Sequence, residues 1–195
     1  MEFSQVVTKR RMVRRYRTDP VPRAVVERIL DAARRAPSAG FAQGQRFIVV
    51  TEPERRSAIG ELADESLYRA RGFEPWLSDA PVHVVLCVST SDYEQRYAEA
   101  DKAGRERWTV PYEFVDAGAA LMAILLTAVN EGVAAGFLGA HRLPGIRDLL
   151  GIPDEVTPVG LVTIGRPAPD RGSRSLARGR KPPEEVIRWE SWAGG

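Results

Sequence analysis

The chain has few of the residues on which many catalytic and structural sites depend. It contains one cysteine, Cys87, and two histidines, His83 and His141. A single cysteine excludes an internal disulfide bond, and neither histidine has a cysteine or histidine partner at metal-ligand spacing. We therefore predict no metal site. Cys87 and His83 lie in one apolar stretch, so we expect a buried, unreactive thiol and a core histidine whose hydrogen bonds are satisfied.

Long apolar runs and an excess of one charge are also missing. The most apolar stretch, residues 114–129, is shorter than the roughly 20 residues that span a bilayer, and no signal-like region follows Met1. Lys and Arg total 28 against 26 for Asp and Glu, a balance that does not favour a general nucleic-acid binder. We therefore expect a cytoplasmic protein with no membrane and no nucleic acid as its partner.

No P-loop, G-x-S-x-G elbow or dinucleotide fingerprint is present, but the hydrophobic pattern is informative. Hydrophobic residues make up 44% of the chain, enough for one globular core. A helix at 114–132 is apolar on all sides and should be buried on most of them. The interpretation is a single α+β domain over residues 1–195. Apolar periodicity and turn residues predict further helices over residues 3–11, 22–37, 53–65 and 143–152, and strands over residues 45–51, 80–90, 132–140 and 156–165.

Positive charge is concentrated near the start, in the stretch "KRRMVRRYRTDPVP". It contains five arginines: Arg10, Arg11, Arg14, Arg15 and Arg17. Such a run is typical of a solvated face, but guanidinium groups also bind phosphate through two hydrogen bonds. An extended segment points alternate side chains to opposite faces, so one subset could bind an anion while the other faces water. The residues alone leave both interpretations open.

Two further segments have an unusual composition. The stretch "APSAGFAQGQRF", residues 36–47, follows a predicted helix with small residues that would let the backbone approach a flat ligand; the alternative is an ordinary loop. The stretch "ARGRKPPEEVIRWESW" places basic residues before a proline pair, and the alternative there is a flexible basic tail.

Five stretches, in order, resemble the nitroreductase family of flavin mononucleotide (FMN) enzymes. The arginine segment is similar to the family's R-R-S-x-R-x-F and D-x-P-V-P motifs. The stretch "APSAGFAQGQRFIVV" is similar to its A-P-S-A-G-N-x-Q-P-W-x-F-x-V-V segment. The other three are "GVAAGFLGA", "LLGIPDEVTPVGLVTIGRPA" and "RGRKPPEEVIRWESW". The resemblance covers most of the chain outside about residues 60–112.

The resemblance implies an α+β sandwich in which helices flank a central, mostly antiparallel sheet. It also implies a homodimer with FMN at the subunit interface, the helix at 114–132 in the dimer core, and residues 182–195 as an arm that wraps the partner. Residues 60–112 have no usable family match, and we expect them to form a lid over the flavin. Their aromatic content places Trp108 and Tyr112 on the substrate side, together with Phe41 from the second stretch.

The resemblance also assigns contacts with FMN. Arg10, Arg11 and Arg180, assisted by Arg178, would hold its phosphate and ribityl chain, and Arg14 would lie at the N1–C2=O edge of the ring. The loop at 37–40 would contact the ring from the other subunit, and the peptide at 139–140 would lie near N5. The expected cofactor-binding residues are Arg10, Arg11, Met12, Arg14, Pro37, Ser38, Ala39, Gly40, Gln43, Gly139, Ala140, Arg178 and Arg180.

The implied activity is hydride transfer from NAD(P)H to the flavin and then, in ping-pong order, to an electron-poor acceptor such as a nitroaromatic or a quinone. This chemistry needs no protein acid or base. A flavin-consuming or dehalogenating relative, or a flavin-binding sensor or carrier without turnover, are the alternatives. The chain departs from the family motifs with Met12 for Ser, Phe41 for Asn, and Gly44 and Gln45 for Pro-Trp. Phe41 adds an apolar surface beside the ring and predicts a bulkier or more apolar acceptor.

Overall fold

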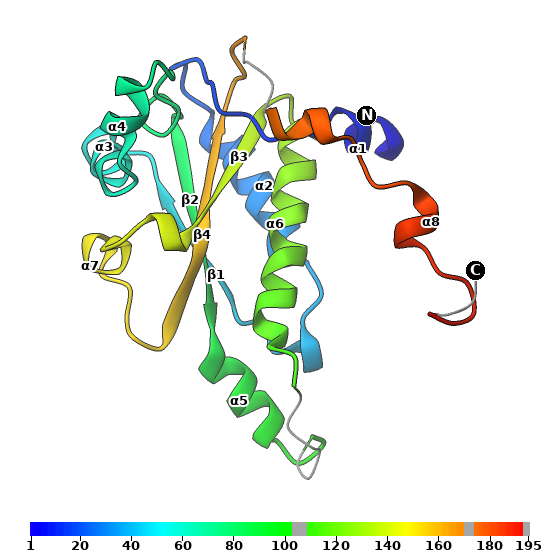
Figure 1. The fold of residues 1–195 in the computed structure, drawn as a ribbon. Helices are drawn as coiled ribbons and strands as arrows, with labels where there is room; N and C mark the ends of the chain where they lie inside the picture. The colour runs from blue at the N-terminus through cyan, green and yellow to red at the C-terminus, as the bar shows by residue number, and fades with distance from the viewer. Residues whose placement is uncertain (103–108, 170–173, 193–195) are drawn as a thin grey trace.

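A computed structural model, which describes residues 1–102, 109–169 and 174–192, is built around one four-stranded sheet (Figure 1). Its strands are β1 (Gln45–Val50), β2 (Val82–Ser89), β3 (Ala134–Gly139) and β4 (Val156–Gly165). They lie in the order β1-β2-β4-β3, and every neighbouring pair is antiparallel. The four predicted strands and the antiparallel sheet are therefore confirmed. β1 and β3 form the two edges of the sheet.

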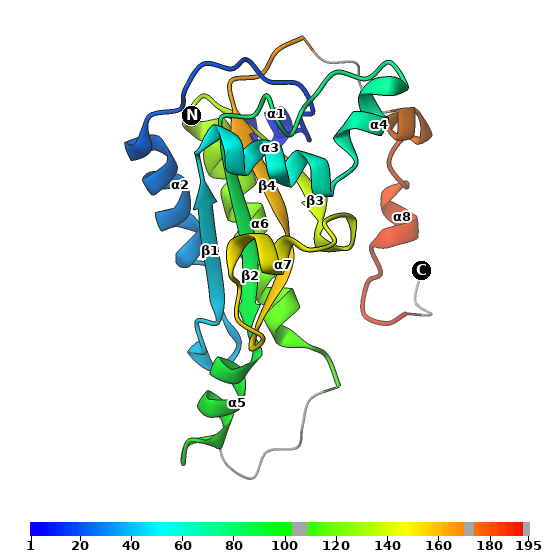
Figure 2. The same ribbon diagram turned by 90° about the vertical axis from the view of Figure 1, so that its left-hand side faces the viewer.

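Helices cover both faces of the sheet (Figures 1 and 2). On one face lie α2 (Arg23–Arg34) and α6 (Tyr112–Asn130), which pack against each other. On the other face lie α3 (Pro53–Leu62), α4 (Glu65–Ala70) and α7 (Ile146–Leu150). This α+β sandwich is the predicted fold. Because both faces are covered, all eight residues of the inner strand β2 are buried, which explains why most of them are apolar.

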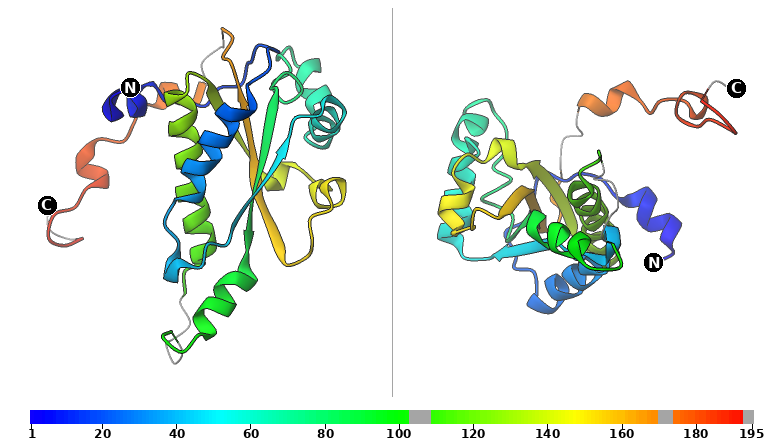
Figure 3. Two further views of the ribbon diagram at one scale, coloured as in Figure 1. Left: turned by 180° about the vertical axis from the view of Figure 1, so that it is seen from behind. Right: turned by 90° about the horizontal axis from the view of Figure 1, so that it is seen from below.

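The remaining elements lie at the margins of the sheet. The chain starts with α1 (Phe3–Lys9), and α5 (Thr90–Ala98) follows β2 beyond one end of the sheet. After β4 the chain passes through the 3₁₀ turn η3 (Arg174–Arg178) to α8 (Pro183–Val186). Figures 1 and 3 show α8 and the C-terminal end lying away from the sheet and its helices. This position leaves Trp189 and Trp192 77% and 85% exposed.

The predicted burial of the long central helix is wrong for the single chain. Only one side of α6 is buried, including Asp116, Ala120 and Ile124, where α2 and the sheet make most of its contacts. Phe114, Val115 and Met122 are exposed. By length and composition α6 is apolar enough to cross a membrane, but one side of it packs on the sheet as a core helix does.

The range predicted as a lid, residues 60–112, includes the fully buried β2. A lid can therefore involve only the parts of this range on either side of that strand, residues 60–81 and 90–112. That role stays a prediction. Trp108 lies outside the described residues.

Cys87 and His83 both lie on β2 with no exposed surface. Burial raises the pKa of Cys87 to about 11, so the thiol is unreactive at neutral pH, as predicted. The prediction for His83 is only half right. Its Nε2 lies 2.7 Å from the carbonyl oxygen of Leu77, whereas its Nδ1 has no hydrogen-bond partner among the described residues. Burial lowers the pKa of His83 to about 4.

His83 should make the fold sensitive to mild acid. Because the folded-state pKa of His83 is about 4 and the ordinary value is about 6.5, the unfolded chain binds a proton first as the pH falls. Stability should drop by about 3 kcal/mol between pH 6.5 and pH 4 through this residue. Urea unfolding at several pH values measures the slope. A His83→Gln variant should have a shallower slope over that window, and equal slopes would contradict the assignment.

Candidate functional site

The arginine segment lies along the edge strand β3. Met12 forms a bridge with Ala135, and the N–H of Val13 donates to the carbonyl of Ala135 at 3.1 Å. Gly136 makes this approach possible, because a Cβ at that position would collide with the carbonyl oxygen of Val13. The buried Tyr16 hydroxyl donates to the carbonyl of Val13 at 2.9 Å and so anchors the segment to the core.

The arginines of this segment fall into two groups. Arg15 pairs with Glu74 at 3.7 Å, and Arg17 pairs with Asp19 at 2.5 Å. Within the described part of the chain, neither Arg10 nor Arg11 has an ion pair or a side-chain hydrogen bond. These two guanidinium groups are therefore available to an external anion, while Arg15 and Arg17 are occupied by carboxylates of the same chain.

Arg14 contacts an aromatic ring that the sequence did not identify. Its guanidinium carbon lies 5.9 Å from the ring centroid of Trp76, within the range of a cation–π interaction. The backbone N–H of Trp76 donates to the buried carboxylate of Glu65 at 2.8 Å, and the N–H of Leu77 donates to the same oxygen at 2.6 Å. Glu65 thus fixes the loop that holds the ring beneath Arg14.

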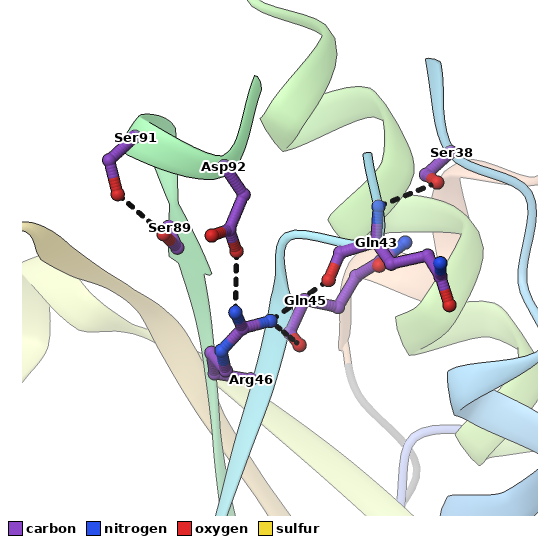
Figure 4. A network of polar contacts seen from close by, with 7 residues as sticks. All are labelled: Ser38, Gln43, Gln45, Arg46, Ser89, Ser91 and Asp92. Carbon is purple, nitrogen blue, oxygen red and sulfur yellow. Dashed lines mark hydrogen bonds and ion pairs between the residues drawn. The ribbon is translucent and has the colours of Figure 1, made fainter. Parts of the chain in front are cut away.

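The loop at residues 37–44 has an unusual backbone. Gly40, Phe41 and Gln43 all have left-handed φ values, between 55° and 61°. For Phe41 and Gln43 this conformation is strained, because a Cβ crowds the backbone there. Figure 4 shows how the end of the loop is held: the N–H of Gln43 donates to Ser38 Oγ at 2.9 Å, and Arg46 donates to the carbonyl of Gln43 at 2.9 Å.

The same loop is fixed from below by α6 and from the side by α5. The N–H of Ala39 donates to Asp116 Oδ2 at 2.8 Å, and the hydroxyl of Tyr93 donates to the same oxygen at 2.7 Å. Arg96 donates to the carbonyl of Gly40 at 2.7 Å. The predicted contact of Ala39 with a flavin therefore cannot use its N–H, which Asp116 already occupies.

The two predicted halves of the site lie far apart in one chain. Met12 lies beside Ala135, which pairs with Ile164 near one end of the sheet, on the edge strand β3. The loop at 37–44 precedes β1, the other edge, and Gln45 pairs with Val88 at the opposite end. With strand spacings of ~4.8 Å and ~3.3 Å per residue, the separation is on the order of 25–30 Å. A single chain does not bring these residues together.

The other predicted residues are distributed as follows. Gly139 ends β3, and Ala140 begins the 3₁₀ turn η2 (Ala140–Arg142), on the same edge strand as the arginine segment. Tyr112 begins α6 and Phe41 is 73% exposed at the tip of its loop. The last two predicted residues, Arg178 and Arg180, are exposed on the segment after β4.

Sequence reasoning missed the residues that support the loop. Asp116 is a carboxylate in an otherwise apolar helix and is only 7% exposed. A charged residue within a run of apolar ones is the signal that could have found it, because a buried charge needs hydrogen-bond partners. Tyr93, Arg96 and Glu65 gave no such signal, since each lies in a polar stretch that resembles a solvated helix.

Relief of the strained loop backbone should stabilise the protein. Asn adopts the left-handed conformation more readily than Phe, and Phe41 is exposed, so Phe41→Asn loses little packing in the single chain. We expect a gain of about 1 kcal/mol in the free energy of unfolding, measured by urea denaturation. Ala42→Asn, beside it in a right-handed conformation, is the control and should give no gain. A loss of stability in Phe41→Asn would show that the ring is packed against something outside the chain.

Comparisons with known proteins identify the family and support the fold. A model of the nitroreductase family matches residues 7–166. FMN reductase (NAD(P)H) of Bacillus subtilis is 30% identical over 200 residues, which cover 98% of this chain and 74% of that protein. The solved structure of the hypothetical oxidoreductase YcnD from Bacillus subtilis is similar, with a TM-score of 0.77 and 28% identity over 98% of this chain and 74% of that one. Iodotyrosine deiodinase of Nematostella vectensis is 27% identical over 205 residues, 95% of this chain and 74% of that protein.

Proposed function

Since the chain belongs to the nitroreductase family, we propose that it is an FMN-dependent oxidoreductase, active as a homodimer. It takes hydride from NAD(P)H and delivers it to an electron-poor acceptor such as a nitroaromatic or a quinone. The names of its relatives, an FMN reductase (NAD(P)H) among them, support this activity.

The observation that carries the proposal is the separation of the two half-sites. The arginine segment and the loop at 37–44 lie at opposite edges and opposite ends of one sheet, on the order of 25–30 Å apart by ideal strand spacings. A second copy of the chain resolves this separation, because a twofold interface can place the loop of one protomer beside the arginines of the other. The site is then complete only in the dimer.

Exposed apolar side chains support the dimer. The uncovered side of α6, the helix α1 and the C-terminal segment all present large apolar groups to solvent in the single chain. Patches of this kind mark interaction surfaces. A partner that covers α6 would also bury the helix on most sides, as its composition predicts. The residues are Phe3, Val7, Phe114, Val115, Met122, Val186, Ile187, Trp189 and Trp192.

The residues present fit FMN. Arg10 and Arg11 have no carboxylate partner among the described residues, and a phosphate would supply the negative charge that pairs them. Arg14 would place a fixed positive charge at the pyrimidine edge of the ring, and the cation–π contact with Trp76 limits where its guanidinium can lie. Small residues at Gly139 and Ala140 would let backbone approach the ring closely.

When bound, FMN supplies the group that accepts hydride and passes it on. The protein's own part is to bind, orient and polarise. Arg14 stabilises negative charge that develops on the ring, and the loop at 37–44 covers one side of it. Hydride transfer through a flavin requires no acid–base dyad of the protein.

The test of the function starts from flavin-free protein. Reconstitution with FMN should give a yellow dimer whose absorbance bleaches on mixing with NADH or NADPH and recovers when a quinone is added. Stopped-flow absorbance separates the two half-reactions. A protein that takes up no FMN contradicts the proposal, and one that binds FMN without bleaching is the sensor or carrier instead.

Loss of the two unpaired arginines should weaken FMN binding specifically. A charge-assisted hydrogen bond to phosphate contributes about 1.5–3 kcal/mol, so Arg10→Ala or Arg11→Ala should raise the FMN dissociation constant about 10- to 100-fold. Flavin fluorescence titration measures this change. Arg17→Ala is the matched control, because Arg17 is exposed and already paired with Asp19. Equal effects of all three variants would contradict the assignment.

Arg14 should affect the redox potential of the bound flavin more than its affinity. Arg14→Ala removes the positive charge beside the ring, so the midpoint potential of bound FMN should fall and its reduction by NAD(P)H should slow. Spectroelectrochemistry and stopped-flow absorbance measure these two changes. Arg14→Lys keeps the charge, so its midpoint potential should stay close to the wild-type value. An unchanged potential in Arg14→Ala would remove the proposed role.

Reductive dehalogenation is a second candidate, favoured by the similarity to an iodotyrosine deiodinase. The acceptor would then be a halogenated phenol, and halide would be released with each turnover. Phe41, exposed at the loop tip, offers a surface for either kind of aromatic acceptor. Halide release from iodophenol by the reduced protein distinguishes this candidate from nitro or quinone reduction.

A further inference from the structure

We propose that Asp116 and Tyr93 are positioning residues, which hold the loop at 37–44 in the shape required to face the flavin. The inference rests on the proposed function. It assigns a task to a buried carboxylate and a buried hydroxyl that are not among the residues predicted to contact the flavin or the acceptor.

Asp116 joins three elements through one oxygen. Its Oδ2 accepts from the N–H of Ala39 at 2.8 Å and from the hydroxyl of Tyr93 at 2.7 Å. Ala39 belongs to the loop, Tyr93 to α5 and Asp116 to α6. The carboxylate therefore links the loop to the helix whose other side is proposed as the dimer surface.

The burial of these groups indicates a specific role. Asp116 is 7% exposed and Tyr93 is 2% exposed, and an ionised carboxylate is costly to bury unless it is hydrogen-bonded. An apolar residue at this point of α6 would pack without that cost. Burial, together with the hydrogen bond to Asp116, raises the pKa of Tyr93, so the hydroxyl remains a donor throughout the working pH range.

Residues around the carboxylate are adapted to the same arrangement. Gly44 is buried under Tyr93, and a Cβ there would collide with the tyrosine ring. From the outer side, Arg96 donates to the carbonyl of Gly40, and Arg46 pairs with Asp92 of α5. The loop is thus held from both sides while its backbone keeps the left-handed turns at Gly40 and Phe41. Asp116 holds the loop from the side of α6, and Arg96 holds it from the side of α5.

The experiment uses Tyr93→Phe, which removes the hydroxyl and keeps the ring above Gly44. In flavin-free protein, amide exchange of residues 38–44 should become at least about tenfold faster, because one hydrogen bond to a charged group is lost. The FMN dissociation constant and the acceptor KM should rise by several-fold, while exchange in β2 and β4 stays unchanged. Tyr68→Phe on α4, which makes the same chemical change on the other face of the sheet, should alter none of these quantities.

Variants of the carboxylate separate shape from charge. Asp116→Asn keeps an oxygen that can accept both hydrogen bonds and should retain most of the exchange protection, whereas Asp116→Ala should lose it. If Asp116→Ala does not fold, Tyr93→Phe and Asp116→Asn still decide the question.

The outcomes distinguish this inference from the proposed function. Wild-type protein that binds no FMN overturns the function, whatever the exchange data show. Wild-type protein that binds FMN, with a Tyr93→Phe variant whose loop exchange or FMN affinity is unchanged, overturns the inference alone. A variant that only melts at a lower temperature, with normal FMN affinity and KM, shows a merely structural role and also overturns it.

Discussion

The arrangement of this protein depends on one constraint, the order of the strands in its sheet. Because β1 and β3 are the two edges, the loop that precedes β1 and the arginine segment that lies along β3 are at opposite corners of the sheet. Hydrogen bonds fix both segments: Val13 to Ala135 at one corner, and Ala39 to Asp116 at the other. Neither can move to meet the other, so a site that needs both requires two copies of the chain.

Much of the fold could be predicted because hydrophobic pattern and turn residues agree along the chain. β2 appears as a mostly apolar run since both of its faces are covered. Gly151 ends α7 in a left-handed conformation, where glycine is favoured. The central helix shows what composition cannot predict. Its composition predicts burial on most sides, but composition does not say whether the cover comes from the same chain, and here Phe114, Val115 and Met122 stay exposed in the single chain.

The site was predicted less completely, for physical reasons. Motif positions identified the arginine segment, and the structure separates the paired Arg15 and Arg17 from Arg10 and Arg11. Long-range partners such as Trp76 for Arg14, or Asp116 for Ala39, are set by tertiary packing between elements far apart in sequence. No local pattern encodes them. The left-handed backbone at Phe41 could not be predicted either, since Phe rarely adopts that conformation.

The central claim, a site completed by two protomers, is tested most directly by mixing subunits. One copy carries Arg10→Ala with Arg11→Ala, and the other carries Ser38→Trp, which blocks the loop. Each variant alone should bind little FMN. If loop and arginines come from different protomers, the mixed dimer contains one intact site and should bind about one FMN per dimer, half the wild-type content. If both come from one protomer, neither site is intact, and a mixed dimer without FMN would contradict the account.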